Sequence, residues 1–178
     1  MYDNTGAQGY GLGGHFTYDN MFQGLVAHDG NRFIGFAAST SFGGISEAFA
    51  QTTSPLTAGV LYTMSAAIAA DDTGRGQANF GGPYTGRGEV KVLLNGNLIG
   101  VFTQNTLSLT WETRSFSFIA PAASSYTFEF VAQLSTGNPG RPPESSYIGL
   151  DGITLIPTPS ALGVLACGAM ALARRPRR

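Results

Sequence analysis

The sequence predicts an all-β domain, an antiparallel sandwich or barrel, and three observations support this class. Only 12% of its 178 residues are charged, whereas aromatic residues reach 11% and glycine alone occurs 25 times. This composition is typical of short strands joined by turns, because helices favour Ala, Leu, Glu, Lys and Arg. Short apolar runs alternate with turn residues along most of the chain. An Asn-Gly pair between two of these runs indicates a tight hairpin.

The N-terminal segment, residues 1–30, is rich in Gly, Asn and Asp, and we expect it to be irregular, with His15–Tyr18 as its only plausible strand. From Asn31 onward, short runs bounded by turn residues predict eight strands. These runs are 32–38, 45–51, 60–69, 89–94, 98–103, 111–119, 126–134 and 147–156. Eight strands at this spacing predict a sandwich or a barrel.

Local patterns support several of these strands. Asn95 and Gly96 tolerate the positive φ angles of a two-residue type I′ turn, so the runs that flank them should pair as a hairpin. Phe116 and Phe118 alternate with serines, and the next run alternates in the same way, so both strands should bury one face. The composition of Met64–Ala70 would also suit a helix, but Val60, Tyr62 and Thr63 before it and the glycine-rich stretch after it favour a strand.

Charge and cysteine content exclude several classes of function. The formal net charge is −1, but four of the ten basic residues are Arg174, Arg175, Arg177 and Arg178, so the rest of the chain carries about −5. A body with this balance lacks the clustered Lys and Arg that nucleic acid requires. The single cysteine, Cys167, lies in the same C-terminal tail, so the body has no disulfide and no thiolate metal site.

Four sequence stretches occur in an order known from one family. They are TSPLTAGVLYTMS at 53–65, VLLNG at 92–96, WETRSFSFIA at 111–120 and YIGLDGITL at 147–155. Their order resembles that of the galactose-binding-like jelly-roll domains, which occur as carbohydrate-binding modules and in bacterial secreted proteins. The resemblance covers roughly residues 29–156. It implies a jelly-roll β-sandwich over 31–156. The apolar tail that follows predicts a short C-terminal hydrophobic helix.

The resemblance also implies a calcium site. In such domains the Asp before the last strand often lies near a structural Ca²⁺, and Asp151 matches that position. Asp29 and Asn31 would supply further oxygen ligands of the kind that Ca²⁺ prefers. The alternative is that Asp151 accepts a hydrogen bond from a neighbouring backbone amide in a turn.

The longest irregular stretch, DDTGRGQANFGGPYTGRG from Asp71 to Gly88, is the first candidate for a sugar site. Sugar sites combine exposed aromatic rings with polar groups that bind hydroxyls. The candidates of these types are Asp71, Asp72, Phe80, Tyr84 and Arg87. Alternatively, the two aromatic residues cover one end of the sandwich and the acids stay solvated. Trp111 has suitable chemistry too, but its place at the start of a strand predicts a core position.

No group of residues has the pattern of a catalytic site. The two histidines lack the spacing of a zinc site, and no serine has a nucleophile context. If the chain is extended at Asp71 and Asp72, their side chains point to opposite faces. Glu89, Glu112 and Glu129 lie in predicted strands, where alternation should turn them to solvent. The sequence therefore predicts a protein that is not an enzyme.

The C-terminal tail, residues 157–178, has a separate layout. Pro157, Thr158 and Pro159 precede Ser160, which could cap a helix, and the 13 uncharged residues 161–173 then lead to the arginine cluster. A helix of this length spans about 20 Å, whereas a helix that crosses a bilayer needs about 20 residues, which span about 30 Å. The arginines suit both a helix C-terminus and anionic headgroups. We therefore expect transient insertion of 161–173 into a membrane.

This order of proline motif, apolar stretch and arginines resembles the PEP-CTERM sorting signal, with Thr158 in place of its central Glu. The resemblance implies cleavage by an exosortase-type membrane protease, a transient inner-membrane stage, and a final place at the cell surface or in the extracellular matrix. Such a signal requires export, yet residues 1–30 contain no basic and apolar leader. We therefore expect that this sequence starts late. A tail that is never cut, and so anchors the protein, is the alternative.

These observations predict a non-catalytic, exported or cell-surface protein that binds extracellular or envelope polysaccharide. The alternative function is a structural or adhesive surface protein whose sandwich has no sugar ligand.

Overall fold

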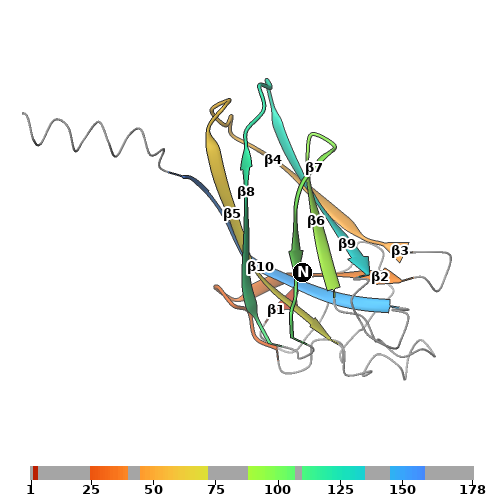
Figure 1. Ribbon diagram of the computed structural model, residues 1–178. Coiled ribbons are helices and arrows are strands. Elements are labelled where there is room, and N and C mark those ends of the chain that lie inside the picture. Colours follow the sequence, from red (N-terminus) through yellow and green to blue (C-terminus); the bar gives the residue numbers. More distant parts are fainter. Residues whose placement is uncertain are drawn as a thin grey trace, which may run out of the picture.

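The computed structural model describes residues 2–3, 25–39, 45–71, 88–106, 110–134 and 145–158 (Figure 1). Within them, ten strands form two antiparallel sheets. Sheet I has the order β1-β2-β10-β5-β8, with β3 on β2, and sheet II has the order β4-β9-β6-β7. The strands are β1 (Tyr2–Asp3), β2 (Arg32–Ser39), β3 (Ile45–Ser46), β4 (Ala48–Thr53), β5 (Leu61–Asp71), β6 (Gly88–Leu94), β7 (Asn97–Thr103), β8 (Glu112–Ile119), β9 (Tyr126–Leu134) and β10 (Ser145–Pro157).

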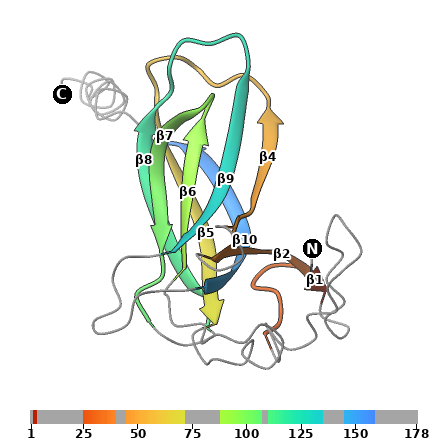
Figure 2. The ribbon, with the colours of Figure 1, turned by 90° about the vertical axis from the view of Figure 1, so that its right-hand side faces the viewer.

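The chain passes repeatedly between the two sheets. After β4 in sheet II it enters β5 in sheet I, forms the β6–β7 hairpin in sheet II, and then adds β8, β9 and β10 to alternate sheets. Figure 2 shows this crossing at the turns that join β4 to β5 and β8 to β9. The predicted antiparallel jelly-roll sandwich is confirmed. The predicted C-terminal helix and the strand predicted at His15–Tyr18 lie outside the described residues. The part of the chain that is described contains no helix able to span a membrane.

One predicted strand, 45–51, is in fact two. The chain leaves sheet I after β3 and joins sheet II at β4, and Glu47 lies at this crossing. Its carboxylate accepts a hydrogen bond from the backbone N–H of Ala37 at 2.7 Å, and its carbonyl accepts one from Ala132 at 2.9 Å. A single residue therefore bonds to both sheets, which the alternation of apolar residues could not reveal. The structure also adds the short strand β1, which the sequence did not predict.

The core lies between the sheets and follows from period-two alternation. In β6 every second residue is buried, and in β5 the run that composition would also allow as a helix is a strand. Phe118 is buried and Phe116 packs against the core, as predicted. Burial of each large apolar side chain contributes about 1.5–3 kcal/mol. The largest fully buried apolar side chains are Tyr126, Phe102, Met64, Ile68, Leu94, Ile148, Leu150, Val90 and Val92.

The β6–β7 hairpin turns at the predicted pair, Asn95 (φ 49°) and Gly96 (φ 80°). Both angles are positive, which a type I′ turn requires. The Asn95 amide also reaches the strand beside it. Its Nδ2 donates to the carbonyl of Ser125 at 2.9 Å, and its Oδ1 accepts from the backbone N–H of Thr127 at 2.9 Å. The turn is therefore bonded to the start of β9.

The two sheets approach closely at the edge formed by β7 and β8. A Cβ atom at Gly100 would lie 2.3 Å from the ring of Phe116, much closer than van der Waals contact allows. The ring of Phe116 also packs against Phe102, with ring centroids 5.0 Å apart. Glycine at position 100 is therefore required for this closure.

Four stretches meet at one end of the sandwich, at the top of Figures 1 and 2, and we call this the uncharged end. It consists of residues 54–61, 95–98, 119–125 and 153–158, none of which is Asp, Glu, Lys, Arg or His. Backbone hydrogen bonds join the stretches to one another. Gly59 donates to Ala120 at 2.9 Å, and Thr158 donates to Leu61 at 2.8 Å.

Candidate functional site

The predicted loop site falls mainly outside the described residues. The structure does not describe four of the five predicted residues, Asp72, Phe80, Tyr84 and Arg87. Of Asp71 only the backbone, at the end of β5, is described. The strand ends that flank this connection are described, however. Gly88 pairs with Leu134, and Asp71 pairs with Tyr147. The connections 72–87 and 135–144 therefore leave the sandwich at the end opposite the uncharged end, which we call the loop end.

Sheet II presents a polar outer surface that begins at the loop end. Because β6 and β9 alternate, the aromatic residues of β9 face the core while every second residue of both strands faces outward. The predictions that Glu89 and Glu129 face solvent are confirmed, since both are partly exposed. We call this surface the polar face. It consists of Glu89, Lys91, Thr103, Thr127, Glu129 and Gln133, with Leu93, Val101 and Val131 between them.

The registers bring the groups of the polar face together in rows. Gln133, Glu89 and Thr103 lie opposite one another across three strands, in the row nearest the loop end. Thr103 Oγ1 donates to the Glu89 carboxylate at 3.0 Å. In the next row Lys91 pairs with Val131. The row at the loop end thus combines carboxylate, amide and hydroxyl groups, which can accept and donate hydrogen bonds to the hydroxyls of a ligand.

The polar face does not have the spacing of a glycosidase. Glu129 lies opposite Leu93, four residues along β6 from Glu89, so the two carboxylate residues are about 13 Å apart at 3.3 Å per residue. Paired catalytic carboxyl groups lie about 5–9.5 Å apart. This pair is therefore better suited to binding than to hydrolysis.

A second cluster lies where β10 bulges. Between Asp151 and Thr154 the pairing with β5 shifts register, and Gly152 has a φ of 56°. The bulge places the Asp151 carboxylate under the segment before β2, where Oδ2 accepts from the backbone N–H of Asp29 at 2.9 Å. Its Oδ1 accepts from the N–H of Gly152 at 2.8 Å. Asp151 therefore makes the hydrogen bonds to backbone amides that the alternative interpretation of this residue expected.

The structure brings two of the three predicted calcium ligands together. Asp29 and Asp151 are adjacent, and Asn31 follows Asp29 by two residues in an exposed turn. Among the described residues, however, no three His, Cys, Asp or Glu side chains form a group that could hold a metal. Backbone and amide oxygens would have to complete a site here. Calcium binding at this cluster stays a prediction.

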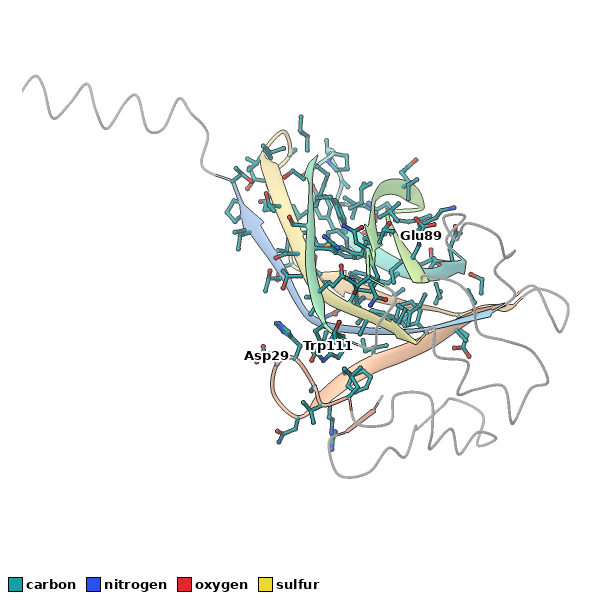
Figure 3. All side chains as sticks on the ribbon, turned by 60° about the horizontal axis from the view of Figure 1, so that its bottom comes forward. Asp29, Glu89 and Trp111 are labelled. Atoms are coloured by element: carbon teal, nitrogen blue, oxygen red, sulfur yellow. The ribbon has the colours of Figure 1, made fainter. Side chains whose placement is uncertain are left out.

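Trp111 fastens the same segment and is not a core residue, which corrects the sequence-based expectation. It is half-buried, and its Nε1 donates to the carbonyl of Val26 at 2.7 Å. Its ring packs edge-on against Phe33, with centroids 5.3 Å apart, and lies 6.2 Å from the ring of His28. Figure 3 shows Trp111 beside Asp29, with Glu89 on the other sheet. The indole thus holds the chain that precedes β2.

Glu112 is also corrected, because it faces inward. It pairs with Ile68 on the face that carries Phe116 and Phe118, and its side chain is only 13% exposed. Its carboxylate accepts from the backbone N–H groups of Thr106 at 2.7 Å and Asn105 at 3.0 Å. The Thr106 hydroxyl donates to it as well.

The pKa of Glu112 reflects this environment. Burial raises it, but the hydrogen bonds from Thr106 and Asn105 and the charge of Arg114 together lower the pKa to about 2. Arg114 bonds directly to the carboxylate. Glu112 is therefore ionised at neutral pH and fixes the turn between β7 and β8. The only sequence feature that could have indicated this role is the position of an acidic residue at the start of an aromatic strand.

Comparisons with known proteins give likenesses among solved structures only. No protein-family model matches the chain, and no curated protein matches it. It is similar to the C-terminal domain of EclA, a sugar-binding protein, with 17% identity and a TM-score of 0.44 over 84% of this chain and 89% of that one. It is similar to a family 16 carbohydrate-binding module, with 14% identity and a TM-score of 0.46 over 74% and 80% of the two chains. A CBM4 structure shows 24% identity and a TM-score of 0.39 over 62% and 61%. None of these identities reaches 25%, so the ligands of those proteins are not transferred to this chain.

Proposed function

We propose that this protein is a non-catalytic domain that binds extracellular or envelope polysaccharide through the polar face. The observation that carries the proposal is the row of Gln133, Glu89 and Thr103 at the loop end of sheet II. These groups complement sugar hydroxyls, and the single charges of Glu89, Lys91 and Glu129 leave a net charge of only −1 on the face, which suits a neutral chain of sugars.

Aromatic stacking would come from the neighbouring connection. The aromatic rings of β9 face the core, so the polar face itself offers hydrogen bonds and aliphatic contacts but no ring. Phe80 and Tyr84 belong to the connection between β5 and β6, which begins and ends at the loop end of the sandwich. We propose that Asp71, Asp72, Phe80, Tyr84 and Arg87 extend the site there. Calcium near Asp29, Asn31 and Asp151 would serve to hold the segment before β2.

Affinity electrophoresis tests this proposal. The full chain, in a mild detergent, is run through gels that contain galactomannan, xylan or laminarin, with and without a chelator. Retarded migration in at least one gel is expected, and loss of the retardation with the chelator would show that calcium supports binding. Unchanged migration in all three gels would favour the alternative, a structural or adhesive surface protein that has no sugar ligand.

We propose further that the tail is a sorting signal, cut by an exosortase-type membrane protease during export to the cell surface or matrix. The position of the last strand supports this. β10 runs to Pro157, and Thr158, the last described residue, has a backbone bond to the sandwich, so a cut after it would leave every described strand intact. The mass of the mature protein tests the idea. A product that lacks 161–178 is expected, and a product that retains the arginines would contradict it.

A further inference from the structure

The uncharged end carries most of the exposed aliphatic side chains in the described residues. Five of the seven large hydrophobic residues classed there as exposed belong to it, and the most exposed are Ile119 (65%), Ile156 (58%) and Leu98 (57%). Leu61 pairs with Ile119 across β5 and β8, and β10 lies on the other side of β5. The exposed side chains of these three strands therefore occupy one outer surface of sheet I.

Several polar groups at this end are bonded to one another. The N–H groups of Gly59 and Ala120 donate to carbonyls within the turns, and Asn95 Nδ2 donates to Ser125. The hydroxyl of Thr63, one row away, is bonded to those of Ser117 and Thr158 at 2.9 Å. Removing an unpaired polar group or a charge from water is costly. This end carries no charged side chain, so contact with the headgroup boundary costs less here than at the loop end.

The chain continues from this end into the apolar stretch of the tail. Only Pro159 and Ser160 separate Thr158, which is bonded to Leu61, from residues 161–173. Three residue steps reach about 10 Å at most. As a helix, residues 161–173 span about 20 Å of a hydrocarbon core that is about 30 Å thick. A helix that is shorter than the hydrocarbon core is accommodated by local thinning of the bilayer or by movement of the flanking residues into the interface.

We infer that the uncharged end is a docking surface for a lipid bilayer, which it contacts while residues 161–173 are inserted. The inference rests on the membrane stage of the proposed sorting signal and adds the orientation of the domain. Ile119, Ile156 and Leu61 enter the headgroup boundary, where exposed aliphatic side chains are stabilised. Glu89 and the carboxylates toward the loop end then lie away from the membrane, where a polysaccharide can reach them.

Collisional quenching by lipid tests the docking surface. The full chain with Cys167→Ser receives one cysteine, either Ala122→Cys at the uncharged end or Thr113→Cys, both exposed positions. Position 113 lies about 20 Å further along β8 than Ile119. Each is labelled with an environment-sensitive fluorophore and reconstituted in phosphatidylcholine–phosphatidylglycerol vesicles that contain spin-labelled lipid. Strong quenching is expected at position 122 and none at position 113.

The chain that keeps Cys167 as the labelled site separates the two levels of the argument. Quenching at Cys167 with none at position 122 would overturn the docking surface while leaving the sorting signal intact. Absence of quenching at Cys167 would contradict membrane insertion, and the docking surface with it. Equal quenching at positions 122 and 113 would overturn the proposed orientation.

Aliphatic side chains provide a second, matched comparison. In the Ala122→Cys chain, the pair Ile119→Ser and Ile156→Ser should lower quenching at position 122 by about threefold or more, because the apolar area that enters the interface is lost. Val26→Ser is the control, because Val26 is equally exposed (60%) but lies beside Trp111 at the other end. Val26→Ser should leave quenching unchanged. A loss as large with Val26→Ser, or no loss with the isoleucine pair, would overturn the inference.

Discussion

The two ends of the sandwich are fixed by different chemistry. At the uncharged end, neutral backbone groups and the Asn95 amide join the turns. Toward the loop end, carboxylates have this role: Glu112 accepts bonds from the β7–β8 turn, and Asp151 accepts bonds from the segment before β2. Both arrangements satisfy backbone donors, but only the second carries charge.

Because of this difference, the two ends suit different partners. Hydrogen bonds between neutral groups persist beside lipid and do not depend on pH. A carboxylate needs water or a partner, and its charge is lost when acid protonates it. Among the described strands, Glu89, Lys91 and Glu129 lie on the polar face, and Glu112 and Asp151 lie toward the loop end. Variants that act on one end, or on both, can test how far this separation extends.

Gly100→Ala should have the largest effect and should affect both ends together. The added Cβ would lie 2.3 Å from the Phe116 ring, at the edge where β7 and β8 close the sandwich. Overpacking of this kind costs about 3 kcal/mol, so the midpoint of urea unfolding should fall in a single transition. Gly59→Ala is a useful contrast, because its site has open space and its cost would come from its φ of 78° alone. Unchanged stability of Gly100→Ala would contradict the closure at this edge.

Glu112→Gln should lower the free energy of unfolding by removing the carboxylate that fixes the turn between β7 and β8, and the loss should depend on pH. The pKa of Glu112 is lowered from 4.5 to about 2, so its contribution is complete above pH 4.5 and is lost as the pH falls toward 2. The cost of the substitution should be about 2 kcal/mol at neutral pH and near zero at about pH 2. Urea unfolding of both proteins at several pH values measures this. A difference that is the same at every pH would contradict the assigned role.

Asn95→Ala should have the smallest effect of the three, about 1 kcal/mol, and no pH dependence. It removes two side-chain hydrogen bonds, one to Ser125 just before β9 and one to Thr127 in β9, and a residue that tolerates a positive φ. Asn97→Ala is the matched control, because Asn97 makes one long bond, 3.3 Å, within the turn. Thermal unfolding across the same pH series should show a constant loss for Asn95→Ala. A loss that grows in acid would place titrating groups at this end after all.

The strands could be predicted because local signals carry them. Alternation of Phe and Ser fixes the buried face of β8, and Asn95-Gly96 fixes the hairpin, whatever the rest of the chain does. Glu47 escaped prediction because its role depends on two partners, Ala37 and Ala132, that are distant in the sequence. Hydrogen bonds between residues that are distant in the sequence produce no periodic pattern of residue types.

The candidate site could be predicted only in part. The sequence suggested that Asp29 and Asp151 would meet, and they do, but through a backbone amide. Alternation counted from Phe116 and Phe118 places Glu112 inward and Trp111 on the other face, so both were misplaced because their residue types, an acid and an indole, favour the opposite faces. The polar face was missed because it exists only once β6 and β9 are paired in register.

The most direct test of the account is affinity electrophoresis of the double variant Lys91→Ala with Gln133→Ala, run as the full chain. Both side chains lie on the polar face and outside the core, so the fold should persist. The control is Thr113→Ala with Ser115→Ala, on the exposed face of β8. We expect that the polysaccharide that retards the unchanged protein also retards the control, and retards the polar-face variant at least about tenfold less. Equal retardation of the two variants would contradict binding through the polar face.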